Sequence, residues 1–141
     1  MLRDPEKTVG GMADKAKLAF ISYIDEDGFP TARAMLRPRE REGIRVFWFS
    51  TNTSSRKVKA FRENPKASVY FVDSRFFRGV SLSGTVEVME TAEVKERIWR
   101  KGDTMYYHKG VTDPDYCVLR FTAQKGRYYS NFKSEDFLIP D

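Results

Sequence analysis

The chain has 141 residues, 40% of them hydrophobic and 14% aromatic, so it is long and apolar enough for one domain with a substantial core. Its single cysteine and single histidine, Cys117 and His108, exclude an internal disulfide and argue against a zinc cluster or a Cys/His catalytic pair. The net charge of +5 keeps an anionic ligand or a nucleic acid among the candidate partners.

The sequence predicts neither a membrane segment nor a secretion signal. No stretch approaches the roughly 18 consecutive apolar residues of a membrane span, and the beginning, MLRDPEKTVGG, lacks an apolar signal core. We therefore expect a cytoplasmic protein, and a single domain over residues 1–141.

The first half of the chain is predicted to form a helix followed by β-hairpins. Asp4-Pro5 starts a helix that reaches residue 16, and Gly10-Gly11 weakens it, so we expect a peripheral, loosely packed helix. Strands are predicted over 17–24 and 29–38, joined by the turn at 25–28. After a turn at 41–43, residues 44–49 are β-branched or aromatic at all but one position, which indicates a mostly buried strand.

The second half begins with a short helix over 55–63, which Asn64-Pro65 ends. Strands are expected over 67–73 and 80–88, with Gly84 marking a bulge, and Thr91 caps a helix to about residue 101. Residues 102–114 are irregular, and 116–122 and 127–130 are predicted to form a last hairpin around 124–126.

The predicted elements amount to six or seven mostly antiparallel strands with single helices between groups of strands. This pattern favours a mainly β fold, a small closed or split β-barrel with peripheral helices. A Rossmann fold is excluded because regular strand–helix alternation and a glycine-rich dinucleotide fingerprint are both missing.

The helix over 55–63 begins with an unusual charge pattern. Acidic residues stabilise the amino end of a helix, where backbone N–H groups are unpaired, but this helix starts Ser55-Arg56-Lys57. Cations and hydroxyl groups at this position suit a bound phosphate. The alternative is a solvated helix whose long side chains bend towards water. Of the nearby arginines, Arg39 and Arg41 flank a turn and are expected in solvent.

Several segments together resemble a known family. They are RAMLR at 33–37, STNTSSRK at 50–57, Glu63-Asn64-Pro65 and RGVSLSG at 78–84. This set, with its spacing, resembles the FMN-binding split barrel of the pyridoxamine 5′-phosphate oxidase superfamily, and most closely its general stress protein branch. The resemblance spans about residues 17–130.

The resemblance implies FMN as the cofactor and a homodimer with the flavin at the subunit interface. Partner-chain residues would complete each pocket, with Arg78 and Tyr128-Tyr129 as candidates. The other implied FMN contacts are Arg33, Ser55, Arg56 and Lys57 at the phosphate, the backbone of Ala34, Met35 and Leu36 along the isoalloxazine ring, and Ser50 and Thr51 near the flavin and ribityl chain.

The chain also departs from the authentic oxidases. Pro38 stands where they carry a lysine, and Gly79 stands where they carry a flavin-contacting glutamine. The arginine-containing segment and chain ending that hold their substrate are missing as well. These differences argue against pyridoxamine phosphate as the substrate. The flavin contact of the glutamine is absent or rebuilt, but the expectation of FMN binding is kept.

The leading hypothesis is an FMN-dependent oxidoreductase that acts on a small-molecule substrate or a nicotinamide donor, with no catalytic residue assigned and no metal. One alternative is a flavin-binding stress or sensing protein without turnover, and another is a barrel that binds haem or a deazaflavin. Nucleic acid is disfavoured, because the basic residues do not follow an aromatic strand face. Tyr106-Tyr107 is a candidate lid, whereas Trp48, Trp99 and Phe76-Phe77 are expected to pack and His108 to be incidental.

Overall fold

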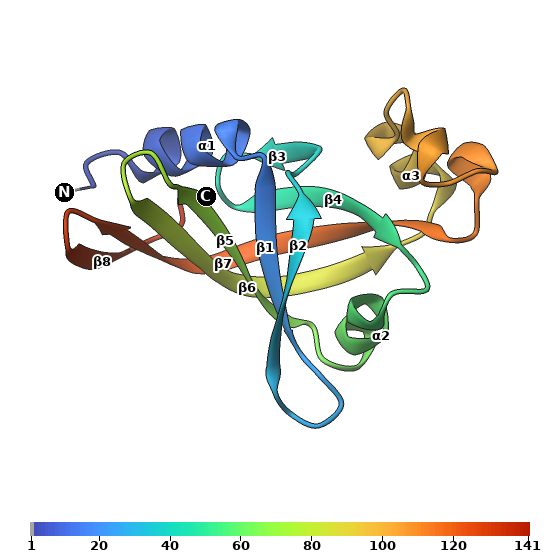
Figure 1. Ribbon diagram of the computed structural model, residues 1–141, viewed down its shortest axis with the longest axis horizontal. Helices are drawn as coiled ribbons and strands as arrows, with labels where there is room; N and C mark the ends of the chain where they lie inside the picture. Colours follow the sequence, from blue (N-terminus) through green and yellow to red (C-terminus); the bar gives the residue numbers. More distant parts are fainter. Residues whose placement is uncertain (1) are drawn as a thin grey trace.

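The computed structural model describes residues 2–141 and contains one antiparallel sheet and three α-helices (Figure 1). The helices are α1 (Pro5–Lys15), α2 (Arg56–Glu63) and α3 (Ala92–Ile98). The eight strands are β1 (Leu18–Ile24), β2 (Pro30–Leu36), β3 (Glu40–Glu42), β4 (Val46–Asn52), β5 (Lys66–Asp73), β6 (Arg78–Met89), β7 (Tyr116–Ser130) and β8 (Lys133–Phe137). Seven strands follow the order β2-β1-β5-β6-β7-β4-β3, and β8 pairs with β7.

The sheet curls around a single main core. In the sheet order β4 and β5 are separated by β6 and β7, yet the Phe47 ring of β4 lies 5.6 Å from the Phe71 ring of β5. Phe47 also contacts Phe121 of β7, with 6.4 Å between the ring centres. All three rings are fully buried. Contact between strands so far apart in the sheet requires the curvature of a barrel, which confirms the predicted split-barrel fold.

The barrel curvature depends partly on Gly84. The pairing of β6 with β7 shifts register between Ser83 and Gly84, and a β-carbon at Gly84 would come within van der Waals overlap of the Thr122 carbonyl oxygen. A glycine is therefore required where the bulge brings the two backbones together. The bulge predicted from the sequence is confirmed.

The carboxyl-terminal hairpin differs from the prediction. Residues 116–130 form one continuous strand, β7, and the hairpin turn lies at 131–132 before β8, so the structure has eight strands rather than six or seven. Gly126, which was interpreted as part of a turn, is opposite Phe137 in the ladder. The aromatic ring of Phe137 occupies the space that a side chain at Gly126 would need.

Helix α1 is more firmly packed than expected. Asp4 caps it by accepting a hydrogen bond from the Lys7 amide at 3.1 Å, and its apolar face buries Val9, Met12 and Ala13 in the main core. The prediction of loose packing was wrong because these three side chains close one end of the barrel. Their burial outweighs the cost of the two glycines.

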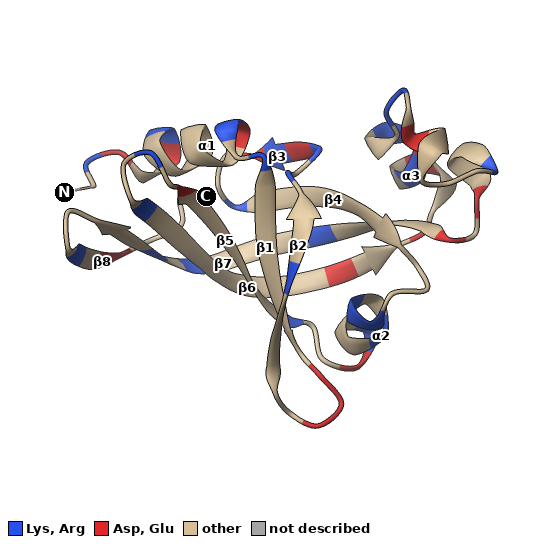
Figure 2. Cartoon of the chain, in the orientation of Figure 1, with Lys and Arg blue, Asp and Glu red and all other residues tan. Residues whose placement is uncertain are grey.

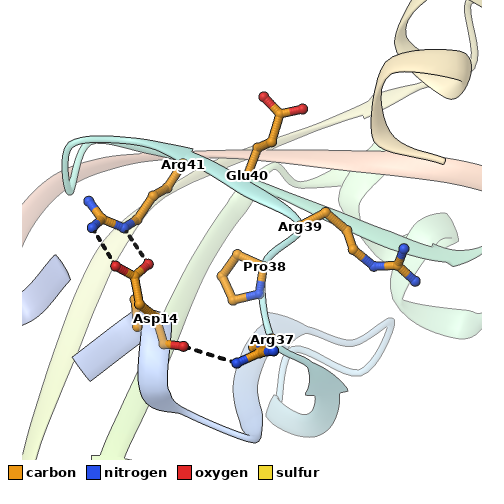
Figure 3. Close-up of a pocket in the computed structure, with 7 residues that line it drawn as sticks. Asp14, Arg37, Pro38, Arg39, Glu40 and Arg41 are labelled. Atoms are coloured by element: carbon orange, nitrogen blue, oxygen red, sulfur yellow. Dashed lines mark hydrogen bonds and ion pairs between the residues drawn. The ribbon is translucent and has the colours of Figure 1, made fainter. Parts of the chain in front are cut away.

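Arginine side chains join α1 to the segment between β2 and β3 (Figure 3). Arg41 makes a two-pronged ion pair with Asp14, with N–O distances of 2.8 and 2.7 Å, and Arg37 donates to the Asp14 carbonyl oxygen at 3.0 Å. The Arg41 guanidinium group lies about 2.9 Å from where a β-carbon on Gly10 would be. Arg41 is thus a helix anchor, and its expected place in open solvent was wrong.

A second apolar cluster lies outside the barrel, between β4, β7 and α3. Its buried members are Trp48, Ile98, Tyr107, Tyr116 and Val118. The Tyr116 hydroxyl donates to the Lys95 carbonyl oxygen at 2.8 Å, and the Lys95 ammonium group donates to the Asp113 carbonyl oxygen at 3.0 Å. The segment 102–114 is therefore packed against the sheet, with Met105 and Tyr106 its exposed large apolar side chains.

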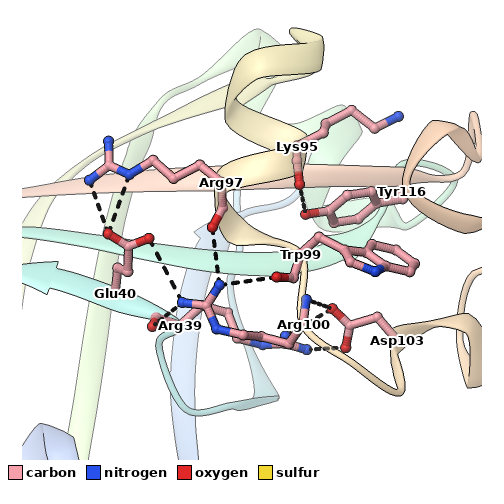
Figure 4. Close-up of polar contacts among 8 residues, drawn as sticks. All are labelled: Arg39, Glu40, Lys95, Arg97, Trp99, Arg100, Asp103 and Tyr116. Atoms are coloured by element: carbon pink, nitrogen blue, oxygen red, sulfur yellow. Dashed lines mark hydrogen bonds and ion pairs between the residues drawn. The ribbon is translucent and has the colours of Figure 1, made fainter.

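Arg39 and Asp103 fix this segment to the strands (Figure 4). They form a two-pronged ion pair at 2.9 and 2.8 Å, and their side chains are only 13% and 5% exposed. Asp103 also accepts from the Arg100 amide at 2.8 Å. The expectation that Arg39 lies in solvent was wrong, since its partner is 64 positions away in the sequence.

We expect Asp103→Asn to lower the free energy of unfolding by about 3–5 kcal/mol, because it leaves a buried guanidinium group without its counter-charge. Urea denaturation measures the change. Asp136→Asn, which opens the exposed ion pair to Arg127, is the matched control and should cost at most about 1 kcal/mol. Equal effects of the two substitutions would contradict the assigned role of Asp103.

Candidate functional site

The amino end of α2 lacks the usual capping. Ser55 is at the N-cap position, but its side chain makes no capping hydrogen bond, and the first turn contains no acidic residue. The Ser55 hydroxyl oxygen is buried without a hydrogen-bond partner among residues 2–141. Buried hydroxyl groups are normally paired, so this end of the helix has unused capacity for a polar ligand.

Lys57 is the most unusual residue of this helix end. It is only 7% exposed, and no carboxylate forms an ion pair with it within the described part of the chain. Burial, together with the nearby Arg33 cation, lowers the pKa of Lys57 below its usual value. A largely buried cation without a counter-charge is costly, and a bound anion would reduce that cost.

Arg33 of β2 and the start of α2 face one cavity of about 530 Å³. Arg33 and Arg56 are exposed and make no ion pair within residues 2–141. The cavity is lined by Tyr23, Thr31, Ala32, Arg33, Ser54, Ser55, Arg56 and Lys57. The four predicted phosphate ligands, Arg33, Ser55, Arg56 and Lys57, are therefore brought together by the fold.

Tyr23, Thr31, Ala32 and Ser54 were missed as lining residues of this cavity. The register of the β1–β2 hairpin pairs Tyr23 with Thr31, so both are near Arg33 once the turn at 25–28 is fixed. The sequence contained this information, because counting outwards from the turn at 25–28 places Tyr23 opposite Thr31.

The predicted ring contacts continue along the same strand. Ala34, Met35 and Leu36 follow Arg33 in β2, where Met35 is buried in the core while Ala34 and Leu36 are exposed. β2 pairs with β1 on one side only. Its other edge has free backbone groups, which agrees with the predicted role of this backbone along a ring edge.

Ser50 and Thr51 are on β4, where successive side chains face opposite sides. Thr51 is buried, and Ser50 is half-buried. Burial raises the pKa of Tyr107 to about 12, so its hydroxyl keeps its proton at neutral pH. Tyr107, which was a candidate lid residue, is instead buried with its ring packed against Trp99 and Tyr116.

Arg78 is not brought to this cavity within one chain. It pairs with Asp73 at 3.0 Å and lines a separate cavity with Leu18, Val72 and Phe76. Phe76 and Phe77 are 61% and 75% exposed, so the expectation that they pack inside was wrong. His108 is exposed and is not among the residues that line the cationic cavity.

Three cations, unpaired N–H groups and a free hydroxyl group converge on one cavity, and this set is suited to a dianionic phosphate. A split barrel with such a helix end is typical of one class of cofactor-binding proteins. The model of the pyridoxamine 5′-phosphate oxidase family matches residues 7–130, and the chain belongs to this family.

Curated relatives match only part of the chain. The pyridoxine/pyridoxamine 5′-phosphate oxidase of Caulobacter vibrioides is 37% identical over 73 residues, which is 52% of this chain and 32% of the relative. The match thus spans about a third of the curated oxidase. None of the helices in the described residues is both long and apolar enough to cross a membrane.

Solved structures match over nearly the whole length. A Clostridium acetobutylicum protein related to general stress protein 26 of Bacillus subtilis is 36% identical, with a TM-score of 0.88 over 96% of this chain and 94% of that one. Two distant structures share the fold alone. They are an FMN-binding protein from Nostoc punctiforme (11% identity, TM-score 0.75, 99% and 98% covered) and a haem-binding protein from Mycobacterium smegmatis (14%, 0.76, 96% and 58%).

We expect Lys57→Met to have opposite effects on stability and anion binding. Replacing the unpaired buried cation should raise the free energy of unfolding of ligand-free protein by about 1–3 kcal/mol and weaken phosphate-ester binding by about 1.5–3 kcal/mol. Because the pKa is lowered in the folded chain, wild-type protein should also gain stability as the pH rises towards 10.5, and the variant should lose this gain.

Thermal unfolding and ligand titration measure both effects. Lys59→Met, on the exposed side of the same helix, is the matched control and should change neither quantity by more than about 0.5 kcal/mol. A destabilised Lys57→Met variant that binds ligand normally would show that Lys57 has a structural role only.

Proposed function

We propose that this chain is an FMN-binding flavoprotein. The observation that carries the proposal is the largely buried Lys57 side chain, which has no ion-pair partner among the described residues, beside the unpartnered Ser55 hydroxyl, at a cavity that Lys57, Arg33 and Arg56 all line. The terminal phosphate of FMN supplies the missing negative charge and hydrogen-bond acceptors. The residues present therefore fit the cofactor.

The strand β2 would orient the cofactor. Arg33 holds the phosphate, and the residues that follow it, Ala34 to Leu36, offer their free backbone edge to the ring. Ser50 of β4 would hydrogen-bond the ribityl chain or ring. When bound, FMN supplies one- and two-electron transfer, and the protein residues bind and orient it.

We further propose an oxidoreductase that acts on a small organic substrate or a nicotinamide donor, as in the flavoproteins that the family is named for. By the resemblance, Pro38 and Gly79 stand where the authentic oxidases carry a lysine and a flavin-contacting glutamine. These differences favour a substrate other than pyridoxamine phosphate.

We also propose a homodimer through the outer face of β1, β2 and β5. Large apolar side chains are exposed there in adjacent register positions: Leu18 faces Leu36, and Phe20 faces Tyr70. Leu18, Phe20, Leu36, Tyr70 and Val72 are 37% to 50% exposed. A contiguous apolar face of this kind is typical of a protein interface.

The first test is the visible spectrum of purified protein, followed by FMN titration of any colourless fraction. We expect flavin absorption, with FMN released on denaturation. Arg56→Ala should weaken FMN binding by about 1.5–3 kcal/mol, the scale of a charge-assisted hydrogen bond. Arg62→Ala, on the same helix but outside the cavity, should bind normally. A haem spectrum, or unchanged affinity in folded Arg56→Ala protein, would contradict the proposal.

The dimer is tested by Phe20→Asp. A charge at the centre of the apolar face should shift the protein from dimer to monomer in light scattering at micromolar concentration, because an unpaired charge is costly in a buried interface. Met105→Asp removes an even more exposed apolar side chain, in the segment after α3, and should leave the dimer intact. A wild-type protein that is monomeric with FMN bound would refute this interface.

A further inference from the structure

A second cavity adjoins the cationic one and has the opposite charge. Its volume is about 310 Å³, and it shares Tyr23, Thr31 and Arg56 with the cationic cavity. The carboxylates of Asp25, Glu26, Asp27 and Glu63 line it, together with Lys59 and Ala60. Figure 2 shows the acidic β1–β2 turn and the basic residues of α2. We name this set of four carboxylates the acidic wall.

The acidic wall has a fixed position relative to the phosphate ligands. The Asp25 carboxylate accepts hydrogen bonds from the Phe29 amide at 2.9 Å, the Asp27 amide at 3.0 Å and the Thr31 hydroxyl at 3.2 Å. These bonds, the Phe29 amide first, lower the pKa of Asp25, so it is ionised at neutral pH. Thr31 lines both cavities, so the turn cannot move away from the phosphate site without breaking the hydrogen bonds of the Asp25 carboxylate.

The order of residues along β2 determines which side chains lie on either side of a bound phosphate. Arg33 holds the phosphate, the residues after it run towards the flavin ring, and those before it lead to the acidic turn. Thr31 is two positions before Arg33 in β2, which corresponds to about 7 Å along the strand. A ligand that continues past the phosphate, away from the ring, therefore enters the cavity with the acidic wall.

We infer that the acidic wall makes this site selective for flavins that end in a single phosphate, and that Glu26 and Asp27 disfavour FAD by repelling its second phosphate. This inference rests on the proposed FMN site. FMN places its terminal phosphate among Arg33, Arg56 and Lys57 and ends there. FAD must carry a further phosphate and adenosine into a cavity where four acidic residues outnumber the two basic ones, Arg56 and Lys59.

Glu26 and Asp27 suit a test because both are exposed and neither side chain holds the turn, which depends on the Asp25 carboxylate. The dissociation constants of FMN and FAD are measured by flavin fluorescence for wild-type protein and for the double variant Glu26→Gln, Asp27→Asn. The double variant Glu42→Gln, Glu96→Gln makes the same change of net charge on exposed residues of β3 and α3, and it is the matched control.

We expect wild-type protein to prefer FMN over FAD, and the Glu26/Asp27 variant to reduce this preference about 5-fold, the scale of one unit-charge interaction near 4 Å in water. FMN affinity itself should change less than FAD affinity. The control should keep the wild-type preference. Repulsion between charges is screened over about 8 Å at physiological salt, so added salt should weaken the preference in wild-type protein and not in the variant.

The inference and the proposed function fail in different ways. If wild-type protein binds FMN but the variant keeps the full preference, or if wild-type protein shows no preference, the acidic wall has no role in selectivity. The FMN site would then still stand. If wild-type protein binds neither flavin, the proposed function itself is refuted, and the inference with it.

Discussion

The Lys57 side chain is largely buried at a helix end that is already positive, and no carboxylate of the described chain forms an ion pair with it. A largely buried cation without a counter-charge costs free energy. Arg33 from β2 and the unpaired Ser55 hydroxyl line the same cavity as Lys57. In the proposed phosphate site, the stability given up here would be recovered as affinity for the anion, which is how uncompensated groups act at binding sites.

Much of the barrel follows from local sequence patterns. The helix end at Ser55, the bulge at Gly84 and the hairpin at 25–28 each depend on a few neighbouring residues, and the structure contains all three. The continuous strand β7 could not be predicted, because Gly126 resembles a turn residue until Phe137 is placed against it. The Arg39–Asp103 pair was equally hidden, since 64 positions separate its partners.

The candidate site, like the barrel, could be predicted only in part from local sequence patterns. Its four proposed phosphate ligands lie in two short segments whose residue types suggest their role. The sequence does not reveal that Lys57 is buried while the adjacent Arg56 is exposed, because this depends on how α2 packs against β1 and β6. Nor does it place Arg78, which lies with Asp73 in another cavity. Residues 25–27 of the acidic wall were predicted from the sequence only as a hairpin turn. Their proposed role in flavin selectivity follows from the cavity that they line together with Arg56.

Strand β7 differs from β2 in how its two faces are covered. Tyr116 to Leu119 are fully buried on both faces of the strand, one against the barrel core and the other against the cluster around Trp48, whereas β2 is an edge strand that buries Met35 alone. Amide protons of residues 116–119 are therefore expected to exchange with solvent through global unfolding, and those of β2 through local opening. The strand proposed to hold the ring is thus a weakly protected edge of the sheet, which a bound ligand would order.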